Sequence, residues 1–152
     1  MDEAIIRRPA PEEAVAIAEV WLRSRAAAAA VIPAPVHSDD EVRRWFGEVV
    51  VPTREVWVAG GPAGDIRAVL VLEDDRVDQL YVDPPWGGRG LGSRLLQVAK
   101  DRRPDGLQLW TFAANHGARR FYERHGFQAV ETTEGYNEEG APDVRYEWRR
   151  QP

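Results

Sequence analysis

The sequence predicts one domain of the α/β (α+β) class, built from a strand, two helices, three strands, a helix, a strand, a helix and two final strands. Three observations lead to this order. First, 152 residues suffice for one hydrophobic core and are too few for two ordinary domains, so we expect a single domain over residues 1–152. Second, runs that alternate apolar and polar residues are interspersed with segments of helical spacing. Third, a glycine-rich turn joins a strand-like run to a helical pattern within residues 80–96.

The N-terminal third is expected to contain a strand and two helices. Residues 4–8 form a first strand, which two prolines end. Apolar residues at helical spacing from residue 12 to about 29 predict an amphipathic helix. Residues 31–37 hold two prolines and are expected to form a loop, because proline lacks the N–H that a helix needs. Ser38 followed by Glu41 fits a capping box, so a second helix is expected to begin there.

The rest of the chain is expected to alternate between strands and two helices. One helix follows the glycine-rich turn, and the other is capped by Asn115 and ends at Gly126. Clusters of glycine, proline, asparagine and aspartate mark the turns between strands. The strands are expected at residues 55–59, 66–72, 76–82, 107–112, 127–133 and 144–148.

The glycine-rich turn is predicted to bind an anionic phosphate group. Four of the six residues 87–92 are glycines, which leave backbone N–H groups uncovered at the positive end of the helix that follows. A P-loop is excluded, because its last glycine would precede Lys and then Ser or Thr, whereas Ser93-Arg94 stand here. A dinucleotide fingerprint is excluded as well, because its third glycine would fall on Leu95 or on Ser93.

The spacing that remains resembles the pyrophosphate-binding signature of the GNAT superfamily of acyl-CoA-dependent N-acyltransferases. That signature is written Q/R-x-x-G-x-G/A and follows a strand ending in V-x-P. Here the chain reads Gly87-Gly88-Arg89-Gly90-Leu91-Gly92 after Val82-Asp83-Pro84. Gly87 stands where the family usually has Gln or Arg, which removes one side-chain contact and leaves the backbone donors in place.

A second signature lies downstream of the first. Residues 115–127 resemble the family segment N-x-x-A-x-x-F-Y-x-x-x-G-F at every named position. The two signatures occur in the family's order, and the resemblance covers roughly residues 67–148. It implies the GNAT fold, a mixed, mainly antiparallel central sheet with helices on both faces.

The resemblance also implies acetyl-CoA as the cofactor. Backbone groups at the end of the strand before the turn would hold the pantetheine arm, and the turn itself would hold the pyrophosphate through N–H groups and Arg89. Asn115 caps its helix and, by resemblance, contacts the cofactor arm. The residues expected at the cofactor are Leu80, Tyr81, Val82, Gly87, Gly88, Arg89, Gly90, Leu91, Gly92, Ser93 and Asn115.

Tyr122 is the expected proton donor to the departing thiolate. A phenol has a reference pKa of about 10, against about 8.5 for a thiol, so it stays protonated at neutral pH. By resemblance Tyr122 occupies the general-acid position of the family. The structural alternative is a core tyrosine whose hydroxyl reaches the surface.

Asp78 is the candidate residue for deprotonating or binding the acceptor amine, because a primary amine is almost wholly protonated at neutral pH. Strict alternation would place Asp78 on the same strand face as Leu80 and Val82. Its carboxylate could act as a base through water or pair with a cationic substrate. The structural alternative is a strand-end charge that reaches solvent beside Asp74-Asp75.

The leading function is acetyl transfer from acetyl-CoA to a primary amine of a small molecule or peptide. The amine would attack the thioester directly in a ternary complex, because the chain has no cysteine to form an acyl-enzyme. The acceptor pocket would form from the first two helices, their connecting loop and the final hairpin. Two alternatives stay open, namely a catalytically silent acyl-CoA-binding or sensing module and a structural subunit in which the turn holds no ligand.

Composition and charge narrow the partners further. The net charge of -5 argues against nucleic-acid binding, and no run approaches the ~20 apolar residues of a membrane span. Met1-Asp2-Glu3 does not begin an export signal, so we expect a cytoplasmic protein. Whether it forms a homodimer is left open. The three histidines have no metal-ligand spacing, so no metal is expected; they are His37, His116 and His125.

Overall fold

A computed structural model of the chain describes residues 4–151; residues 1–3, on which the expectation about an export signal rests, and residue 152 lie outside the described residues. The strands are β1 (Ile5–Arg7), β2 (Glu55–Gly60), β3 (Ile66–Glu73), β4 (Arg76–Val82), β5 (Leu107–Phe112), β6 (Gln128–Thr133) and β7 (Asp143–Trp148). Within residues 4–151 they form one seven-stranded sheet in the order β1-β2-β3-β4-β5-β7-β6. Neighbouring strands are antiparallel except β4 and β5, which are parallel.

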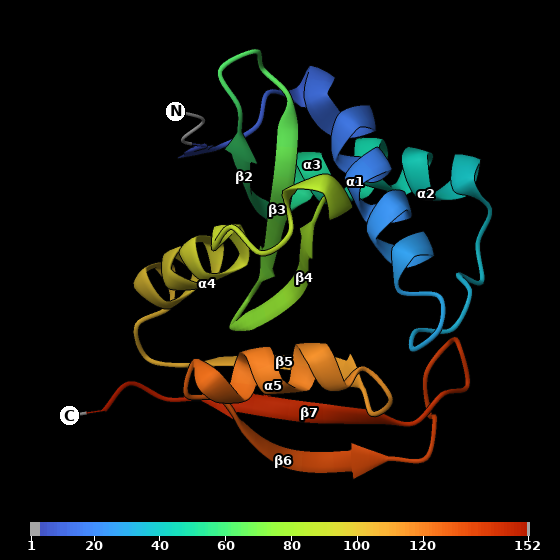
Figure 1. Ribbon diagram of the computed structural model, residues 1–152, viewed down its shortest axis with the longest axis vertical. Coiled ribbons are helices and arrows are strands. Elements are labelled where there is room, and N and C mark those ends of the chain that lie inside the picture. Colours follow the sequence, from blue (N-terminus) through green and yellow to red (C-terminus); the bar gives the residue numbers. More distant parts are fainter. Residues whose placement is uncertain (1–3, 152) are drawn as a thin grey trace.

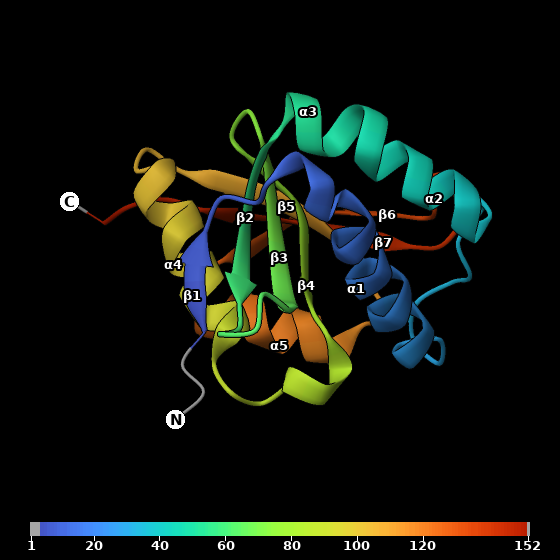
Figure 2. The ribbon, with the colours of Figure 1, turned by 90° about the horizontal axis from the view of Figure 1, so that it is seen from above.

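Helices cover both faces of this sheet (Figures 1 and 2). The longer helices are α1 (Ala14–Ala27), α2 (Asp39–Trp45), α4 (Leu91–Arg102) and α5 (His116–Arg124), and the short turns are η1 (Pro11–Glu13), η2 (Phe46–Val50), α3 (Val51–Thr53) and η3 (Pro84–Trp86). Side chains of α1, α2 and η2 pack on one face, and those of α4 and α5 pack on the other. The predicted fold class is therefore confirmed. Among the helices within residues 4–151, none has the length and apolar character that crossing a membrane requires.

Strand β3 contributes side chains to both hydrophobic cores. Its successive side chains point to opposite faces, so Ala68 and Leu70 join the core beneath α4, while Val69 and Val71 join the core beneath α1. All four are fully buried. This explains the nearly continuous apolar run of the strand, and it makes β3 a fixed support for the neighbouring β4.

The sheet opens between β4 and β5. Arg76 and Gln108 are the one pair that joins these strands within the described residues. Beyond that pair the strands diverge, as Figure 1 shows, so the later residues of β4 face no strand on the β5 side. An unpaired strand edge inside a domain offers free backbone donors and acceptors to a ligand.

A β-bulge at Asp78 corrects one sequence-based expectation. The pairing of β4 with β3 shifts by one residue there, which leaves Asp78 as the extra residue. Val77, just before it, packs in the same core as Leu80 and Val82, so the side-chain alternation is interrupted. The expectation that Asp78 shares a face with Leu80 and Val82 is therefore wrong. Its carboxylate instead accepts a hydrogen bond from Arg54, which follows α3 on the α2 side of the sheet.

Glu55, at the start of β2, joins that strand to the end of α4. Its carboxylate accepts hydrogen bonds from Arg102 (2.6 Å), Trp57 (2.8 Å) and Arg103 (3.0 Å). Burial alone would raise the pKa of Glu55, but these three bonds outweigh it and hold the pKa at about 2. A carboxyl group whose folded pKa is depressed stabilises the fold above its unfolded pKa, and that contribution is lost as the pH falls through the folded value.

We therefore expect Glu55→Gln to lower the free energy of unfolding by about 2 kcal/mol at pH 7, allowing for solvent screening of the half-exposed Arg102. The difference from the parent should shrink as the pH falls from about 4.5 toward 2. Urea denaturation across this range measures it, with Glu12→Gln, an exposed glutamate, as the control. If Glu55→Gln lowered the free energy of unfolding by the same amount at every pH, the ionised carboxylate would not be what stabilises the contact.

Candidate active site

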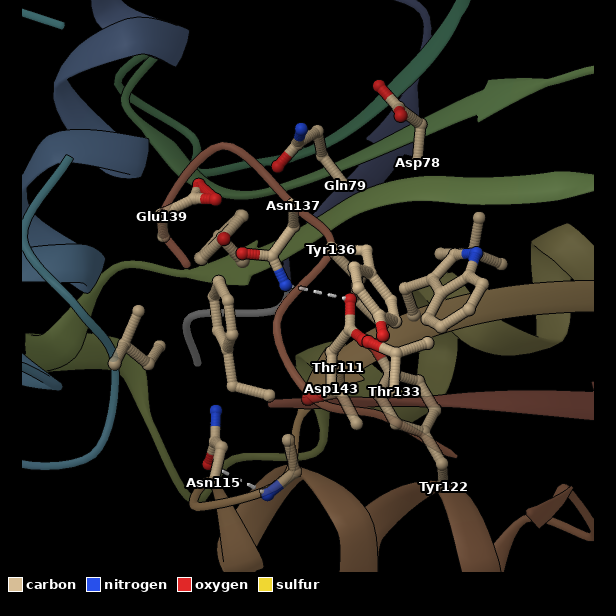
Figure 3. A pocket seen from close by; sticks show the side chains of 17 residues that line it. Asp78, Gln79, Thr111, Asn115, Tyr122, Thr133, Tyr136, Asn137, Glu139 and Asp143 are labelled. Carbon is tan, nitrogen blue, oxygen red and sulfur yellow. Dashed lines mark hydrogen bonds between the residues drawn. The ribbon is translucent and has the colours of Figure 1, made fainter. Parts of the chain in front are cut away.

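A cavity of about 440 Å³ lies where β4 and β5 diverge (Figure 3). Its walls come from β4, β5, α5 and the β6–β7 hairpin, with Ile32 from the loop after α1. These segments are distant in sequence and meet only through the sheet topology. Sequence-predicted site residues that line the cavity are Asp78, Leu80, Tyr81, Asn115 and Tyr122.

The backbone of β4 presents alternate residues to the cavity. Asp83 N donates to Arg67 O (2.8 Å). Since bonded and non-bonded pairs alternate along an antiparallel ladder, we infer that Tyr81 directs its backbone groups to β3, and that Leu80 and Val82 direct theirs toward β5. Leu80 and Val82 thus lie as expected for backbone contacts, whereas Tyr81 offers its side chain.

The C-terminal half of α1 fixes the end of β4. Arg23 donates two hydrogen bonds to the buried carboxylate of Asp83 (2.8 and 2.9 Å). Ser24 Oγ donates to the Val82 carbonyl (2.8 Å). The Val82 carbonyl is therefore engaged within the protein, and its N–H remains on the open side. The two contacts hold β4 toward α1 and away from β5.

The turn after β4 carries a run of unpaired backbone donors. Gly88 and Gly90 adopt positive φ angles of 74° and 80°, a region that glycine enters without the strain of a side chain. Within the described residues, none of the N–H groups of residues 88–93 donates a hydrogen bond to the protein, and the helical bonding of α4 starts with Arg94 N to Gly90 O (3.0 Å). Consecutive free N–H groups at a helix N-terminus suit an anionic phosphate.

Trp86 supports this turn from the side of the core. The Arg67 guanidinium carbon lies 3.6 Å from the Trp86 ring centroid, and that of Arg89 lies 5.0 Å away. The family resemblance placed Gly87 among the cofactor contacts. In the structure its N–H donates a hydrogen bond to the Pro84 carbonyl (3.2 Å). This N–H is therefore engaged within the turn. Arg89 remains exposed beside the free donors, where a charge-assisted contact is expected.

His125 is a site neighbour that the sequence did not reveal. Its Nε2 lies 3.0 Å from Ser93 Oγ, and its Nδ1 lies 2.8 Å from the Phe121 carbonyl. Since the Phe121 carbonyl is an acceptor, Nδ1 carries a hydrogen and donates to it, and in that tautomer Nε2 can accept from Ser93 Oγ. His125 thus orients the Ser93 hydroxyl at the start of α4. The contact depends on the packing of α4 against α5, so no local spacing could have predicted it.

Tyr122 projects from α5 into the cavity wall (Figure 3). Its ring is buried against Phe127 and Tyr146. The hydroxyl makes no hydrogen bond to any residue the structure describes, so its proton is not engaged by the protein. Burial, and to a lesser extent Tyr81, raises the pKa of Tyr122 above its ordinary value. The group therefore stays protonated at any pH at which the fold would work.

Asn115 caps α5, as expected. Its Oδ1 accepts a hydrogen bond from Ala118 N at 3.2 Å. Figure 3 shows the amide nitrogen of Asn115 directed toward the interior of the cavity. One side chain can therefore satisfy the helix end and still offer a donor to a ligand.

Asp78 lies in the cavity wall but is engaged by arginines. Its Oδ2 lies 2.5 Å from Arg54 Nη1, and its Oδ1 lies 3.8 Å from Arg76 Nε. Figure 3 shows the carboxylate pointing away from Tyr122. Asp78 and Tyr122 thus line the same cavity, but the Asp78 carboxylate is directed toward Arg54 and not toward Tyr122.

A second cavity of about 520 Å³ adjoins the first. It is formed by α1, α2, their connecting loop and the β6–β7 loop, the segments expected to make the acceptor pocket. Gln79 and Glu139 line both cavities and mark their junction. Gln79 is held there by Trp21, whose Nε1 donates to its side-chain oxygen (3.1 Å). Within the described residues no group of three or more potential ligands could hold a metal ion.

Comparison with protein families gives a match to one family model. Residues 52–129, half of the chain, match an acetyltransferase (GNAT) domain. The matched segment contains the turn with free donors, β5 and all of α5. It thus includes both glycine-containing signatures and most of the first cavity.

Individual proteins resemble longer or shorter parts of the chain. An uncharacterised N-acetyltransferase of Methanocaldococcus jannaschii is 36% identical over 64 residues, 40% of this chain and 28% of that protein. YjaB of Escherichia coli, named a peptidyl-lysine N-acetyltransferase, is 27% identical over 130 residues, 85% of each chain. The solution structure of YjaB without ligand superposes with a TM-score of 0.78 at 23% identity over 97% of this chain and 99% of that chain.

A ligand-bound neighbour has the same fold. The PaiA N-acetyltransferase of Thermoplasma acidophilum, solved in complex with coenzyme A, superposes with a TM-score of 0.70 at 16% identity. The superposition covers 96% of this chain and 98% of that one. At this identity the likeness concerns the fold.

Proposed function

Since the chain belongs to the GNAT acetyltransferase family, we propose that it transfers an acetyl group from acetyl-CoA to a primary amine by direct attack in a ternary complex. The observation that carries the proposal is the run of free N–H groups at residues 88–93. It leads along the open edge of β4 to a cavity in which the Tyr122 hydroxyl has no partner among the described residues. The proposal treats residues 1–152 as one acetyltransferase domain.

The residues present fit acetyl-CoA along this path. The donors of residues 88–93 and the cation of Arg89 suit the pyrophosphate. The open backbone groups of Leu80 and the Val82 N–H suit the amide groups of the pantetheine arm, with the Asn115 amide across the gap. Coenzyme A bound to a neighbour of the same fold supports this use of the site. When bound, the thioester would supply an activated acetyl group to the cavity that Tyr122 lines.

The chemistry requires one proton donor and one proton acceptor. The acceptor ammonium loses one proton to become nucleophilic, and its nitrogen attacks the thioester carbonyl. As the carbon–sulfur bond breaks, Tyr122 would donate its proton to the departing sulfur, and the new amide nitrogen would release its second proton to water. Free CoA and an acetylated amine result, and Tyr122 is reprotonated from solvent.

For the amine proton we keep Asp78, acting through water, as the proposed base. Asp78→Asn should lower kcat about a hundredfold at neutral pH, within the range of general-base effects. The loss should shrink as the pH rises, because more of the amine is then neutral without help. Glu73→Gln is the matched control, since Glu73 pairs with the same Arg54 (3.1 Å) but does not line the cavity. A pH profile identical to that of the parent would remove Asp78 from the mechanism.

Release of free CoA from acetyl-CoA, followed across polyamines, aminoglycosides, amino acids and peptides, tests the proposed reaction. We expect release that depends on the acceptor, with the acceptor gaining one acetyl group by mass spectrometry. No release across the panel, with acetyl-CoA still bound, would contradict the proposal and favour an acyl-CoA-sensing module.

A further inference from the structure

Arg25, on α1, is a buried cation without a hydrogen-bonded anion. Its side chain is 8% exposed, and its Nε has no hydrogen-bond partner within the described residues. Nη2 donates a long bond to the Pro33 carbonyl (3.3 Å), and Glu139 Oε1 lies 4.0 Å away, beyond hydrogen-bond distance. Arg25 and Glu139 therefore form a long ion pair without a hydrogen bond, and a buried guanidinium whose N–H groups lack acceptors is unfavourable. The arrangement has room for an anionic group that the protein does not supply.

Arg25 stands where the two cavities meet. Its guanidinium carbon lies 4.8 Å from the Trp21 ring centroid in the second cavity and 5.9 Å from the Phe112 ring centroid in the first. Burial raises the pKa of Tyr81, and the neighbouring Arg25 acts against that rise. Since Tyr81 lines the first cavity, the cation of Arg25 is close to any acceptor that passes from one cavity to the other.

Glu139 supplies the opposite charge at the same junction. It lines both cavities, its side chain is 18% exposed, and its carboxylate accepts no hydrogen bond from any residue the structure describes. Arg25 and Glu139 are thus neighbours that are not hydrogen-bonded to each other. Such a pair is complementary to a ligand that carries both an ammonium and a carboxylate.

We propose that the acceptor is a small amine of amino-acid type, whose carboxylate binds Arg25 while Glu139 holds its ammonium at the entrance to the first cavity. This inference rests on the proposed acetyl transfer and names the substrate class for the same site. A polyamine or an internal peptide lysine has no carboxylate to offer, so it would leave Arg25 without a hydrogen-bonded anion.

The remainder of the second cavity favours an apolar amino-acid side chain. Its lining includes the apolar side chains of Trp21, Val42, Trp45 and Val49. Two carboxylates at its mouth are already engaged, because Glu41 caps α2 and Glu138 lies 2.5 Å from His37 Nε2. The mouth is therefore less suited to a polycation than its number of glutamates suggests.

Binding of the reaction product tests this assignment without any chemistry. Protein saturated with CoA is titrated by calorimetry with N-acetylphenylalanine and with N-acetylphenylalaninamide, which differ only in the carboxylate. We expect the acid to bind about tenfold tighter or more, the size of a charge-assisted contact with arginine. Arg25→Gln should remove the difference, and Arg25→Lys, which keeps the charge in case Arg25→Gln fails to fold, should keep part of it.

Arg44→Gln is the control, because Arg44 is an exposed arginine at the mouth of the same cavity. The difference between acid and amide should persist in this variant. Equal affinities in the parent, or a difference that survives in Arg25→Gln, would overturn the assignment. If either of these results were found and CoA were still released with other amines, the proposed acetyl transfer would stand and only the assigned class of acceptor would be refuted.

Discussion

Tyr122→Phe should lower kcat about a hundredfold or more while the KM for acetyl-CoA stays nearly unchanged. The substitution removes only the hydroxyl, which has no partner among the described residues and lies in the wall of the first cavity. Because burial keeps the group protonated, the loss should be the same across the working pH range. Steady-state kinetics at several pH values measure both constants.

The matched control for Tyr122→Phe is Tyr146→Phe. The Tyr146 hydroxyl accepts from Arg119 (3.1 Å) and donates to Glu123 (2.7 Å), so its removal leaves bonded partners behind. We expect this variant to lose about 1–2 kcal/mol of stability with kcat largely kept. Tyr122→Phe should instead keep the parental stability and lose most of kcat. Unaltered turnover in Tyr122→Phe would show that Tyr122 is not the proton donor.

Gly90→Ala should raise the KM for acetyl-CoA about tenfold with a smaller effect on kcat. Gly90 is the N-cap of α4 and has a φ of 80°. A side chain there should cost roughly 1–2 kcal/mol and should turn the free N–H groups of residues 88–93 away from their present directions. Space is not the limit, because a Cβ at this position would meet nothing within 4 Å.

Gly64→Ala separates backbone strain from cofactor binding. Gly64 has a similar φ of 85° and equally open surroundings, but it lies in the turn between β2 and β3. This variant should lose comparable stability and keep the parental KM for acetyl-CoA. If both glycine variants changed the KM equally, the turn after β4 would not be the pyrophosphate site.

The architecture was largely predictable because its signals are local. Strands β2 to β5 begin and end within one residue of the expected positions, since alternation and turn residues mark them directly. The predicted capping box of Ser38 and Glu41 is present at the start of α2. The π-helical turn η2 was not expected, because nothing in residues 46–50 distinguishes it from an α-helix.

Features that depend on distant segments escaped prediction. The bulge at Asp78 arises from the pairing of β4 with β3, so alternation read along β4 alone placed its carboxylate on the wrong face. Arg25 reads as one of several arginines near a helix end, and its burial becomes visible only when the β6–β7 loop brings Glu139 beside it. The contact of His125 with Ser93 likewise joins residues on different helices.

The central claim is that acetyl-CoA binds between β4 and β5 with its pyrophosphate at residues 88–93, and thermal unfolding tests it most directly. A ligand at a hundred times its Kd stabilises the folded state by about 2.7 kcal/mol. For a chain of this size that predicts a rise in Tm of roughly 5–10 °C with acetyl-CoA, and a much smaller rise for Gly90→Ala at the same concentration. A Tm that does not change at millimolar acetyl-CoA would contradict the account.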